Sequence, residues 1–376
     1  MTEKILVTGG AGFIGSHIVD GLLRKGYDVS VLDNLNPQVH GPNAGVPSYL
    51  DKNAEFFLGD VRDYDALKKI LARVDVVFHE AAAVGVGQSM YQIREYVETN
   101  SMGAANILHF IANEKHHIRK MIVASSMSIY GEGAYQCPQC GQIFPRLRTI
   151  AQLKKREWEM ICESCGKTAK AIPTSETKPL YPTSIYAITK RDHEEMFLST
   201  GFAFQIPAIA LRYFNVYGTR QALSNPYTGV CAIFASRLLN DHSPMIYEDG
   251  LQARDFTHVS DIVQANLLAL EAGREADYEA FNVGTGVGIP IKTVGERLRS
   301  LLGKDDLSFE FPDKFRSGDI RHCYADISKI GDILGYSPKI RFEDGVKELV
   351  EWVKMQTAED KVRTAAKELE EKGLIL

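Results

Sequence analysis

The chain has 376 residues, with 24% charged and 45% hydrophobic side chains and a net charge of −5. These values are ordinary for a globular protein, and the mild acidity argues against binding to nucleic acid or an anionic membrane. The N-terminal segment lacks signal-peptide features, and no run approaches the roughly 18 apolar residues of a transmembrane helix. We expect a cytoplasmic protein of one large or two moderate domains, with cysteines as metal ligands or free thiols.

Short apolar runs alternate with helical patterns along much of the chain. Strands are predicted at Lys4–Thr8, Tyr27–Leu32, Ala54–Leu58, Val74–His79, Lys120–Ser125 and Ala208–Tyr213. Helices are predicted at Ser16–Lys25, Tyr64–Ala72, Ile93–Glu114, from Tyr186 to Thr200 and near Cys231–Leu239. This alternation predicts an α/β protein with a doubly wound parallel sheet of the Rossmann type. Beyond Arg254 the short strands and helices mix, which favours a smaller second α/β lobe.

A glycine-rich turn, Gly9-x-x-Gly12-x-x-Gly15, joins the first predicted strand to the first predicted helix. Glycine lets the backbone turn sharply and approach a pyrophosphate, which the helix N-terminus attracts. Asp33 stands 18 residues beyond Gly15, where a carboxylate accepts from ribose hydroxyls and repels a 2′-phosphate. The pattern predicts a site for NAD in preference to NADP, with a structural turn as the alternative. Asp60, after the third strand, either contacts adenine or caps the next helix.

A hydroxyl group and a Tyr/Lys pair flank the middle of the chain. Tyr186 and Lys190 are four residues apart in a predicted helix, so they share one face. A nearby ammonium favours the phenolate and makes the tyrosine a base. Ser126 ends a predicted strand, at the edge of the sheet where ligands bind. Tyr-x-x-x-Lys alone is common in helices, but with the glycine motif and the serine it predicts a catalytic site.

Taken with further motifs, the chain resembles the extended short-chain dehydrogenase/reductase family, in its nucleotide-sugar epimerase/dehydratase branch. The resemblance covers residues 1–350 apart from a cysteine-containing insert, and rests on Thr8-Gly-Gly-Ala-Gly-Phe-Ile-Gly15, Asp60-Val61, His79-Glu-Ala-Ala82, Asn100 with Gly103, Ser125-Ser126-x-x-Ile-Tyr-Gly131, Tyr186-x-x-x-Lys190, Arg212-Tyr-Phe-Asn215-Val-Tyr-Gly218, Arg254-Asp-Phe-x-His258-Val-x-Asp261, Asn282-Val-Gly284 and Arg316-x-Gly-Asp-x-Arg321. It implies that the catalytic residues are Ser126, Tyr186 and Lys190.

The resemblance also implies the ligand contacts. NAD is expected at Gly9, Gly12, Phe13, Ile14, Gly15, Asp33, Asn34, Asp60, Val61, Ala81, Ala82, Asn100, Tyr186, Lys190 and Tyr213. The nucleotide-diphosphate sugar is expected at Ser128, Asn215, Arg254 and Arg316. Arginine suits the diphosphate because its planar fork pairs with phosphate oxygens. A homodimer is expected to form through the helices near 93–114 and 186–200.

The expected domain organisation follows from the motifs. Residues 1–133 and 175–215 form the NAD-binding Rossmann domain, and residues 134–174 form a zinc-ribbon-like insert. Residues 216–356 form most of the nucleotide-sugar lobe, with a segment near 255–285 returning to the Rossmann domain. Residues 357–376 form a C-terminal helix.

The mechanism implied by the resemblance is transient oxidation of a sugar C4 hydroxyl, with Tyr186 as the base. A 4,6-dehydratase of this family needs an acidic pair just after the catalytic hydroxyl, where this chain has Met127 and Ser128, so dehydration is disfavoured. C4 epimerisation is the simplest outcome, and decarboxylation and ketoreduction are alternatives. The segment Tyr217–Gly229 resembles the branch that includes dTDP-L-rhamnose 4-epimerases, while UDP-glucose and UDP-glucuronate stay open. An alternative of another class is a non-catalytic, NAD-sensing zinc-ribbon interaction protein.

Four of the six cysteines form two Cys-x-x-Cys pairs with 21 residues between them, and a glycine follows each pair. This spacing predicts a structural Zn²⁺ site at Cys137, Cys140, Cys162 and Cys165. Four protein ligands leave no open coordination position, so no catalytic role is expected. Disulfides or free thiols are the alternative.

The insert also carries a basic patch, expected to be a solvated face or a lid over the sugar site, at Arg146, Arg148, Lys154, Lys155 and Arg156.

Overall fold

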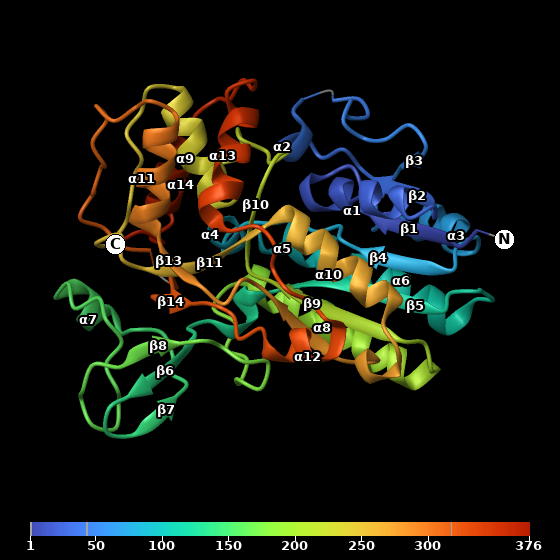
Figure 1. Cartoon of the computed structure of the whole chain (residues 1–376), viewed down its shortest axis with the longest axis horizontal. Coiled ribbons are helices and arrows are strands. Elements are labelled where there is room, and N and C mark those ends of the chain that lie inside the picture. Colours follow the sequence, from blue (N-terminus) through green and yellow to red (C-terminus); the bar gives the residue numbers. More distant parts are fainter. Residues whose placement is uncertain (1, 43, 317) are drawn as a thin grey trace.

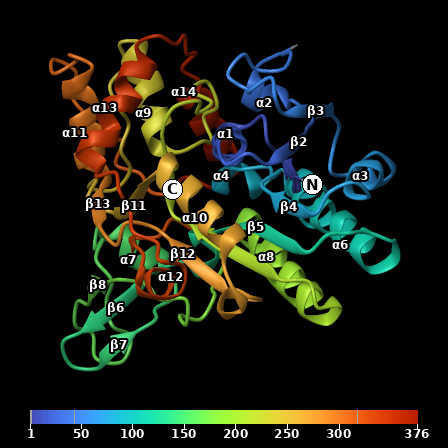
Figure 2. The ribbon, with the colours of Figure 1, turned by 45° about the vertical axis from the view of Figure 1, so that its right-hand side comes forward.

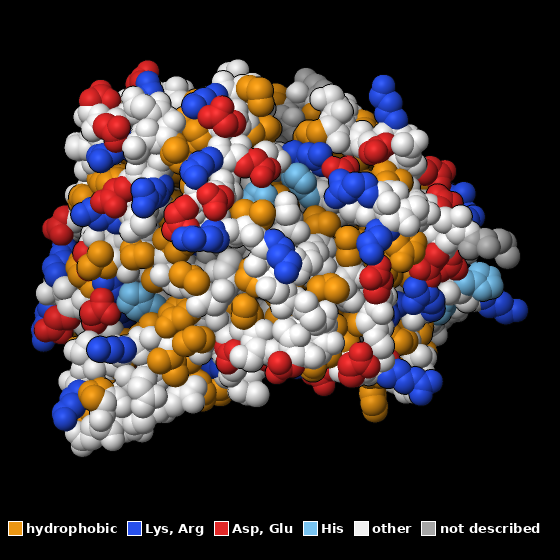
Figure 3. Space-filling model, viewed as in Figure 1, with side chains coloured by type: hydrophobic (Ala, Val, Ile, Leu, Met, Phe, Trp, Pro, Cys, Tyr) orange, Lys and Arg blue, Asp and Glu red, His pale blue; other side chains and the backbone are white. Residues whose placement is uncertain are grey.

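The computed structural model describes residues 2–42, 44–316 and 318–376. A seven-stranded sheet with its helices forms one half of the molecule, and a second lobe lies beside it (Figure 1). A small three-stranded unit projects below the second lobe in both ribbon views (Figures 1 and 2). Acidic and basic side chains alternate over the face in Figure 3 without forming a large patch of one sign.

The large sheet is parallel throughout, which confirms the predicted fold class. Its order is β12 (Ala280–Val283), β9 (Ala208–Tyr213), β5 (Lys120–Ser126), β4 (Val76–His79), β1 (Lys4–Thr8), β2 (Asp28–Asp33) and β3 (Glu55–Leu58). The chain reverses its direction of winding at β1, between β2 and β4. In such sheets a crevice opens at this point, beyond the carboxyl ends of the strands.

Helices cover both faces of this sheet, because side chains of successive strand residues point in opposite directions. Ile5 and Val7 of β1 join a core with α1 (Phe13–Arg24) and α10 (Val259–Glu271). Leu6 joins the opposite core, with α3 (Tyr64–Leu71), α6 (Gly103–Asn113) and α8 (Ile185–Phe204). Each fully buried Leu, Ile or Val stabilises the fold by about 1.5–3 kcal/mol.

The predicted helix Ile93–Glu114 is present but not uniform. It begins as α5 (Ile93–Tyr96), passes through a π-helical turn at Val97–Met102 and continues as α6. A π-helical turn adds a residue to one turn and is frequent at functional sites. Short helical segments on the same half are α2 (Pro37–His40), α4 (Val86–Ser89) and the 3₁₀ turns Met127–Tyr130 and Arg274–Ala276.

The second lobe has its own sheet and its own apolar core. Its strands are β10 (Asn215–Tyr217), β11 (Ala253–His258), β13 (Gly288–Pro290) and β14 (His322–Cys323). Its core is formed by α9 (Val230–Leu239), α11 (Ile291–Leu301) and α13 (Phe342–Val353). The segment 259–283 supplies α10 and β12 to the large sheet, and α12 (Ser328–Leu334) also contacts that core.

The last helix, α14 (Val362–Glu371), reaches back to the rest of the molecule. Glu368 accepts hydrogen bonds from the hydroxyls of Tyr91 and Tyr227, both at 2.8 Å. Phe315 and Leu376 exchange two backbone hydrogen bonds, which hold the C-terminal end beside the segment before Arg316. Of the described helices, none has both the length and the apolar character needed to cross a membrane.

The insert is a small antiparallel sheet in the order β7 (Gly141–Ile143), β6 (Ala134–Cys137) and β8 (Lys170–Ile172), with a short helix α7 (Ile150–Lys154). Its core contains Tyr135, Met160 and Ala169 together with Cys137 and Cys162. So small a core contributes little stability by itself, and units of this size commonly need a metal or disulfides.

Candidate functional site

A cavity of about 480 Å³ lies between the large sheet and the second lobe. Its walls come from the glycine-rich turn, from the residues after β4 and β5, from the start of α8 and from the segment after β10. The cavity is therefore at the carboxyl ends of the parallel strands, beside the reversal at β1.

The glycine-rich turn is built for close approach. Gly9 has φ +68°, and a Cβ there would lie 2.8 Å from the backbone of Ala81. A Cβ on Gly15 would lie 2.2 Å from the carbonyl oxygen of Gly9. Gly12 precedes α1 without a side chain to cap its first N–H groups, so these donors can face an anion. The turn thus fits the pyrophosphate of a dinucleotide.

Asp33 is fixed at the rim of this turn. One carboxylate oxygen accepts from the N–H of Ala11 at 3.0 Å and the other from the N–H of Leu35 at 2.9 Å. Asp60 accepts from Asn34 at 2.8 Å and from the Arg62 guanidinium at 2.8 and 2.9 Å. Burial opposes ionisation of Asp60, but these hydrogen bonds outweigh it and lower the pKa of its carboxyl to about 2.

Ser126, Tyr186 and Lys190 all line the cavity. The Ser184 side chain accepts from the N–H of Ala187 and begins α8 there, which places Tyr186 in the first turn and Lys190 in the second. Ser128 donates its hydroxyl to the Ser126 oxygen at 2.9 Å. Burial raises the pKa of the Tyr186 phenol to about 12, while hydrogen bonding with Ser126 acts in the opposite direction.

Lys190 is buried and its ammonium donates to the carbonyl oxygen of Ala124 at 2.9 Å. Burial lowers the pKa of Lys190, and the nearby carboxylate of Glu80 raises it. Burial raises the pKa of Glu80, which accepts from the Tyr213 hydroxyl at 3.0 Å. Asn266 in turn donates to the Tyr213 hydroxyl at 2.7 Å. The two charges partly compensate each other inside the cavity wall.

Most of the sequence-predicted NAD and sugar residues line this cavity. They are Gly9, Gly12, Phe13, Ile14, Gly15, Asp33, Asn34, Asp60, Val61, Ala81, Ala82, Ser128, Tyr213 and Asn215, together with the proposed catalytic residues Ser126, Tyr186 and Lys190. The Asn215 amide oxygen is buried without a hydrogen-bond partner among the described residues, which marks it as an acceptor available to a ligand.

The same architecture occurs in known proteins. Residues 5–169 match the NAD dependent epimerase/dehydratase family, and residues 163–349 match the model of GDP-mannose 4,6 dehydratase. A dTDP-L-rhamnose 4-epimerase of Burkholderia thailandensis is 34% identical over 354 residues, covering 93% of this chain and 95% of that protein. The chain belongs to the NAD-dependent epimerase/dehydratase family.

Other members of the family differ in the reaction that they catalyse. A UDP-N-acetyl-alpha-D-glucosaminuronate decarboxylase of Bacillus cytotoxicus is 30% identical, covering 94% of this chain and 98% of that protein. The crystal structure of a UDP-glucuronic acid 4-epimerase from Bacillus cereus, in complex with UDP-glucuronic acid and NAD, superimposes with a TM-score of 0.76. Its identity is 29%, with 94% of this chain and 99% of that chain covered.

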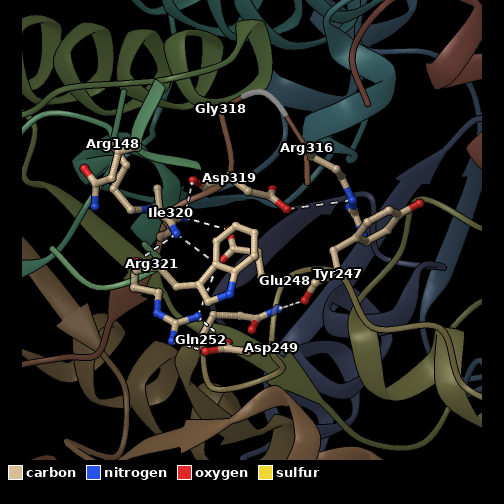
Figure 4. Close-up of polar contacts among 12 residues, drawn as sticks. Arg148, Tyr247, Glu248, Asp249, Gln252, Arg316, Gly318, Asp319, Ile320 and Arg321 are labelled. Carbon is tan, nitrogen blue, oxygen red and sulfur yellow. Dashed lines mark hydrogen bonds and ion pairs between the residues drawn. The ribbon is translucent and has the colours of Figure 1, made fainter. Parts of the chain in front are cut away.

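Three of the predicted contact residues lie off the cavity wall. Asn100 lies in the π-helical turn. Its amide oxygen accepts from the N–H of Ala83 at 2.8 Å, and its amide nitrogen donates to the Ala83 carbonyl at 3.1 Å and to the Thr189 hydroxyl at 2.9 Å. It therefore shapes the wall from behind. Arg254 donates to three backbone carbonyls, and Arg316 lies 4.5 Å from the centre of the Tyr247 ring (Figure 4).

Sequence reasoning missed several residues of the wall. Glu80 lies within the motif His79–Ala82, but a carboxylate after a strand did not by itself indicate that it lies close enough to Lys190 to raise the pKa of the ammonium group. Gln88, Tyr96 and Phe256 also line the cavity and carry no local signal. The segment Tyr217–Gly229, on which the resemblance to the dTDP-L-rhamnose 4-epimerase branch rests, contributes further wall residues, among them Asn225, Tyr227 and Thr228.

The four cysteines of the insert come together. Their sulfurs all lie within 4.8 Å of one another, as one group of four and not as two bonded pairs. Tetrahedral zinc–thiolate bonds of about 2.3 Å place sulfurs about 3.8 Å apart, so this donor set fits zinc. Cys137 and Cys162 are buried and Cys140 is exposed, which puts the group at the edge of the insert's small core.

The basic patch is not a uniform solvated face. Arg148 is buried, and Arg146 lies over the Tyr181 ring at 3.5 Å from its centre. Lys154, Lys155 and Arg156 are exposed, as expected. The prediction is therefore wrong for Arg148, because an acidic partner far away in the sequence binds its guanidinium.

Proposed function

We propose that the protein catalyses NAD-dependent C4 epimerisation of a nucleotide-diphosphate sugar. The observation that carries this proposal is the grouping of Ser126, Tyr186 and Lys190 on one cavity wall, between the glycine-rich turn and the second lobe. The similarity to 4-epimerases over nearly the whole chain supports the reaction class.

The cofactor in this proposal is NAD, which would accept a hydride from sugar C4 and return it. The glycine-rich turn would hold the pyrophosphate, and Asp33 would accept from the adenosine ribose hydroxyls. The carboxylate of Asp33 would repel a 2′-phosphate, and the guanidinium of the nearby Arg62 already binds the carboxylate of Asp60. NAD is therefore favoured over NADP.

The chain's own residues supply the proton chemistry. Ser126 is positioned to bond the C4 hydroxyl, and Tyr186 would take its proton as the sugar becomes a 4-ketone. The Lys190 ammonium favours the tyrosinate. The sugar then turns, so that the hydride would return to the opposite face of C4, and Tyr186 gives the proton back to the C4 oxygen.

The residues after Ser126 argue for epimerisation over dehydration. Met127 has a thioether and Ser128 a hydroxyl, so neither supplies a carboxylate for proton transfer at C5 or C6. The similarity to a decarboxylase keeps loss of CO₂ as an outcome to be tested. For the sugar itself we propose dTDP-L-rhamnose, on the similarity over 93% of the chain to the enzyme from B. thailandensis.

The test is a panel of UDP-, dTDP-, GDP- and CDP-sugars followed by NMR. Inversion at C4 without net NADH formation, loss of CO₂ or loss of water supports the proposal, and inversion of dTDP-L-rhamnose above the others supports the substrate. UDP-glucose or UDP-glucuronate inversion would correct the substrate alone. If no sugar is converted although NAD is bound, the enzyme proposal fails in favour of a non-catalytic NAD-sensing protein.

We further propose that Cys137, Cys140, Cys162 and Cys165 bind a structural zinc ion. The grouped sulfurs and the small core of the insert support this. Metal analysis of the reduced protein should give about one zinc per chain. A value near zero with four titratable thiols would refute the proposal.

A homodimer is also proposed, through the π-helical turn, α6 and α8. Val97, Met102 and Ile188 are exposed on these helices, between 42% and 54% of their surface. The π-helical turn packs against α8, and exposed apolar side chains on neighbouring helices favour association. Light scattering should give twice the mass of one chain, and Met102→Glu should shift the population toward monomer.

A further inference from the structure

The insert is joined to the second lobe by a buried network of charges (Figure 4). The side chains of Arg148, from the insert, and Arg321, from the lobe, are 1% and 0% exposed. Both bind Glu248, whose side chain is 4% exposed. Two buried arginines that share one carboxylate need further acceptors, and the structure provides them from both sides.

Arg148 makes four hydrogen bonds. It binds both carboxylate oxygens of Glu248, at 2.8 and 2.9 Å, and the carbonyl oxygens of Trp158 at 3.0 Å and Asp319 at 3.2 Å. The guanidinium thus ties the insert to two separate parts of the lobe.

Arg321 is held by carboxylates of both units. Glu159 of the insert accepts from it at 2.6 and 3.1 Å, and Asp249 of the lobe accepts at 2.7 and 2.9 Å. The backbone of the same segment is also held, because Glu132 accepts from the N–H of Arg321 at 2.6 Å. Arg148 and Glu248 form a buried pair between the insert and the lobe, and removal of either partner would leave the other charge buried and uncompensated, so the insert cannot swing freely from the lobe.

The network ends at Arg316. Its guanidinium faces two groups, the Tyr247 ring at 4.5 Å and the Asp319 carboxylate at 3.7 Å (Figure 4). Tyr247 precedes Glu248, which Arg148 binds, and Arg148 also binds the Asp319 carbonyl. Arg148 therefore contacts the backbone of one neighbour of Arg316 and the side chain of the residue that follows the other.

The same segment approaches the catalytic helix. The Thr183 hydroxyl donates to the carbonyl oxygen of Gly318 at 3.3 Å, and Thr183 stands three residues before Tyr186. The insert also contacts the segment that leads into α8, because Arg146 lies over the Tyr181 ring. The insert thus borders both the Arg316 segment and the approach to α8.

We propose that the four-cysteine insert is a substrate brace, in which Arg148 is a positioning residue for Arg316 and metal binding keeps the brace formed. This rests on the proposed function and on the expectation from the family resemblance that Arg316 binds the nucleotide diphosphate. Trp158 and Glu159 lie just before Cys162, so the metal holds the segment that supplies two of the brace contacts. Loss of the metal or of Arg148 weakens nucleotide-sugar binding and leaves the NAD site intact.

The experiment compares Arg148→Gln, Cys140→Ala and the double variant in the full-length, NAD-loaded protein. Arg148→Gln should raise KM for the nucleotide sugar and Kd for dTDP or UDP about tenfold, with kcat within about twofold of wild type. Its zinc and NAD contents should not change. Cys140→Ala should lose the metal and show a similar rise in KM and Kd. In the double variant, KM and Kd should rise no further than in the more strongly affected single variant.

Lys155→Gln is the matched control, since it removes an exposed positive charge from the same insert. If Arg148→Gln does not fold, Glu159→Gln replaces it, because this side chain is 47% exposed; its KM should rise about threefold. KM and nucleotide Kd within twofold of wild type in a folded variant, or fully additive effects in the double variant, would overturn the brace. If wild type converts no nucleotide sugar, the proposed function fails, whereas conversion with unchanged variants refutes the brace alone.

Discussion

The two sides of the cavity hold their polar groups in different ways. On the side of the large sheet, two backbone N–H groups hold Asp33 and one backbone carbonyl holds Lys190, at 2.9–3.0 Å, and both side chains still face the cavity. On the side of the second lobe, Arg254 and Arg316 bind other parts of the protein and lie off the wall. The first side is organised by local backbone, whereas the second depends on contacts among the lobe, the insert and the C-terminal segment.

The largest expected effect is on the first side. Tyr186→Phe removes the proposed base without changing the ring, so kcat should fall about 10³-fold. NMR of C4 inversion measures the rate, and the NAD content should equal that of wild type. Tyr64→Phe, which removes a hydroxyl from α3 away from the cavity wall, is the control. Loss of bound NAD in Tyr186→Phe would mean that the tyrosine holds cofactor and not the reacting proton.

The second effect tests whether Asp33 is organised for NAD. Asp33→Ala removes a charged acceptor, and NAD affinity should fall about tenfold to hundredfold. Calorimetry on NAD-stripped protein measures this affinity. Asp28→Ala, at the exposed start of the same strand, should bind NAD as wild type does. Equal affinities for the two variants would contradict the role of Asp33.

The third effect tests the second side. Arg316→Gln should raise KM for the nucleotide sugar about tenfold, with a small change in kcat and none in NAD content. Steady-state kinetics separates the two parameters. Arg341→Gln, with a side chain 80% exposed in the same lobe, is the control. A fall in kcat with unchanged KM would place Arg316 near the reacting atoms and remove the contrast between the sides.

The smallest effect concerns pH. Glu80 raises the pKa of Lys190 against the effect of burial, so Glu80→Gln should lower the pKa of this ammonium further. Because the proposed mechanism uses the charged lysine, the alkaline decline of kcat/KM should move to lower pH, by about one unit or less. Glu114→Gln, which removes a carboxylate away from the cavity wall, should leave the profile as it is. A shift to higher pH would contradict the pairing.

The features that depend on neighbours along the chain could be predicted from the sequence alone. Apolar runs such as Lys4–Thr8 and Ala208–Tyr213 form strands as predicted, because short apolar segments between turns have few other structures that bury them. The spacing of Tyr186 and Lys190 and the glycine-rich turn are equally local. Their common position at the carboxyl edge follows from the parallel sheet.

The burial and the partners of several polar side chains depend on distant segments and became apparent only in the folded structure. Arg148 is buried because Glu248, 100 residues away, meets it inside the interface. Asn100 lies in a π-helical turn that no local pattern predicted, and it bonds the backbone of Ala83 from behind the wall. Arg254 is bound by carbonyls of Ile320 and Arg321, which sequence spacing cannot place. Local sterics fix strands and turns, while the partners of a buried charge are chosen by the complete fold.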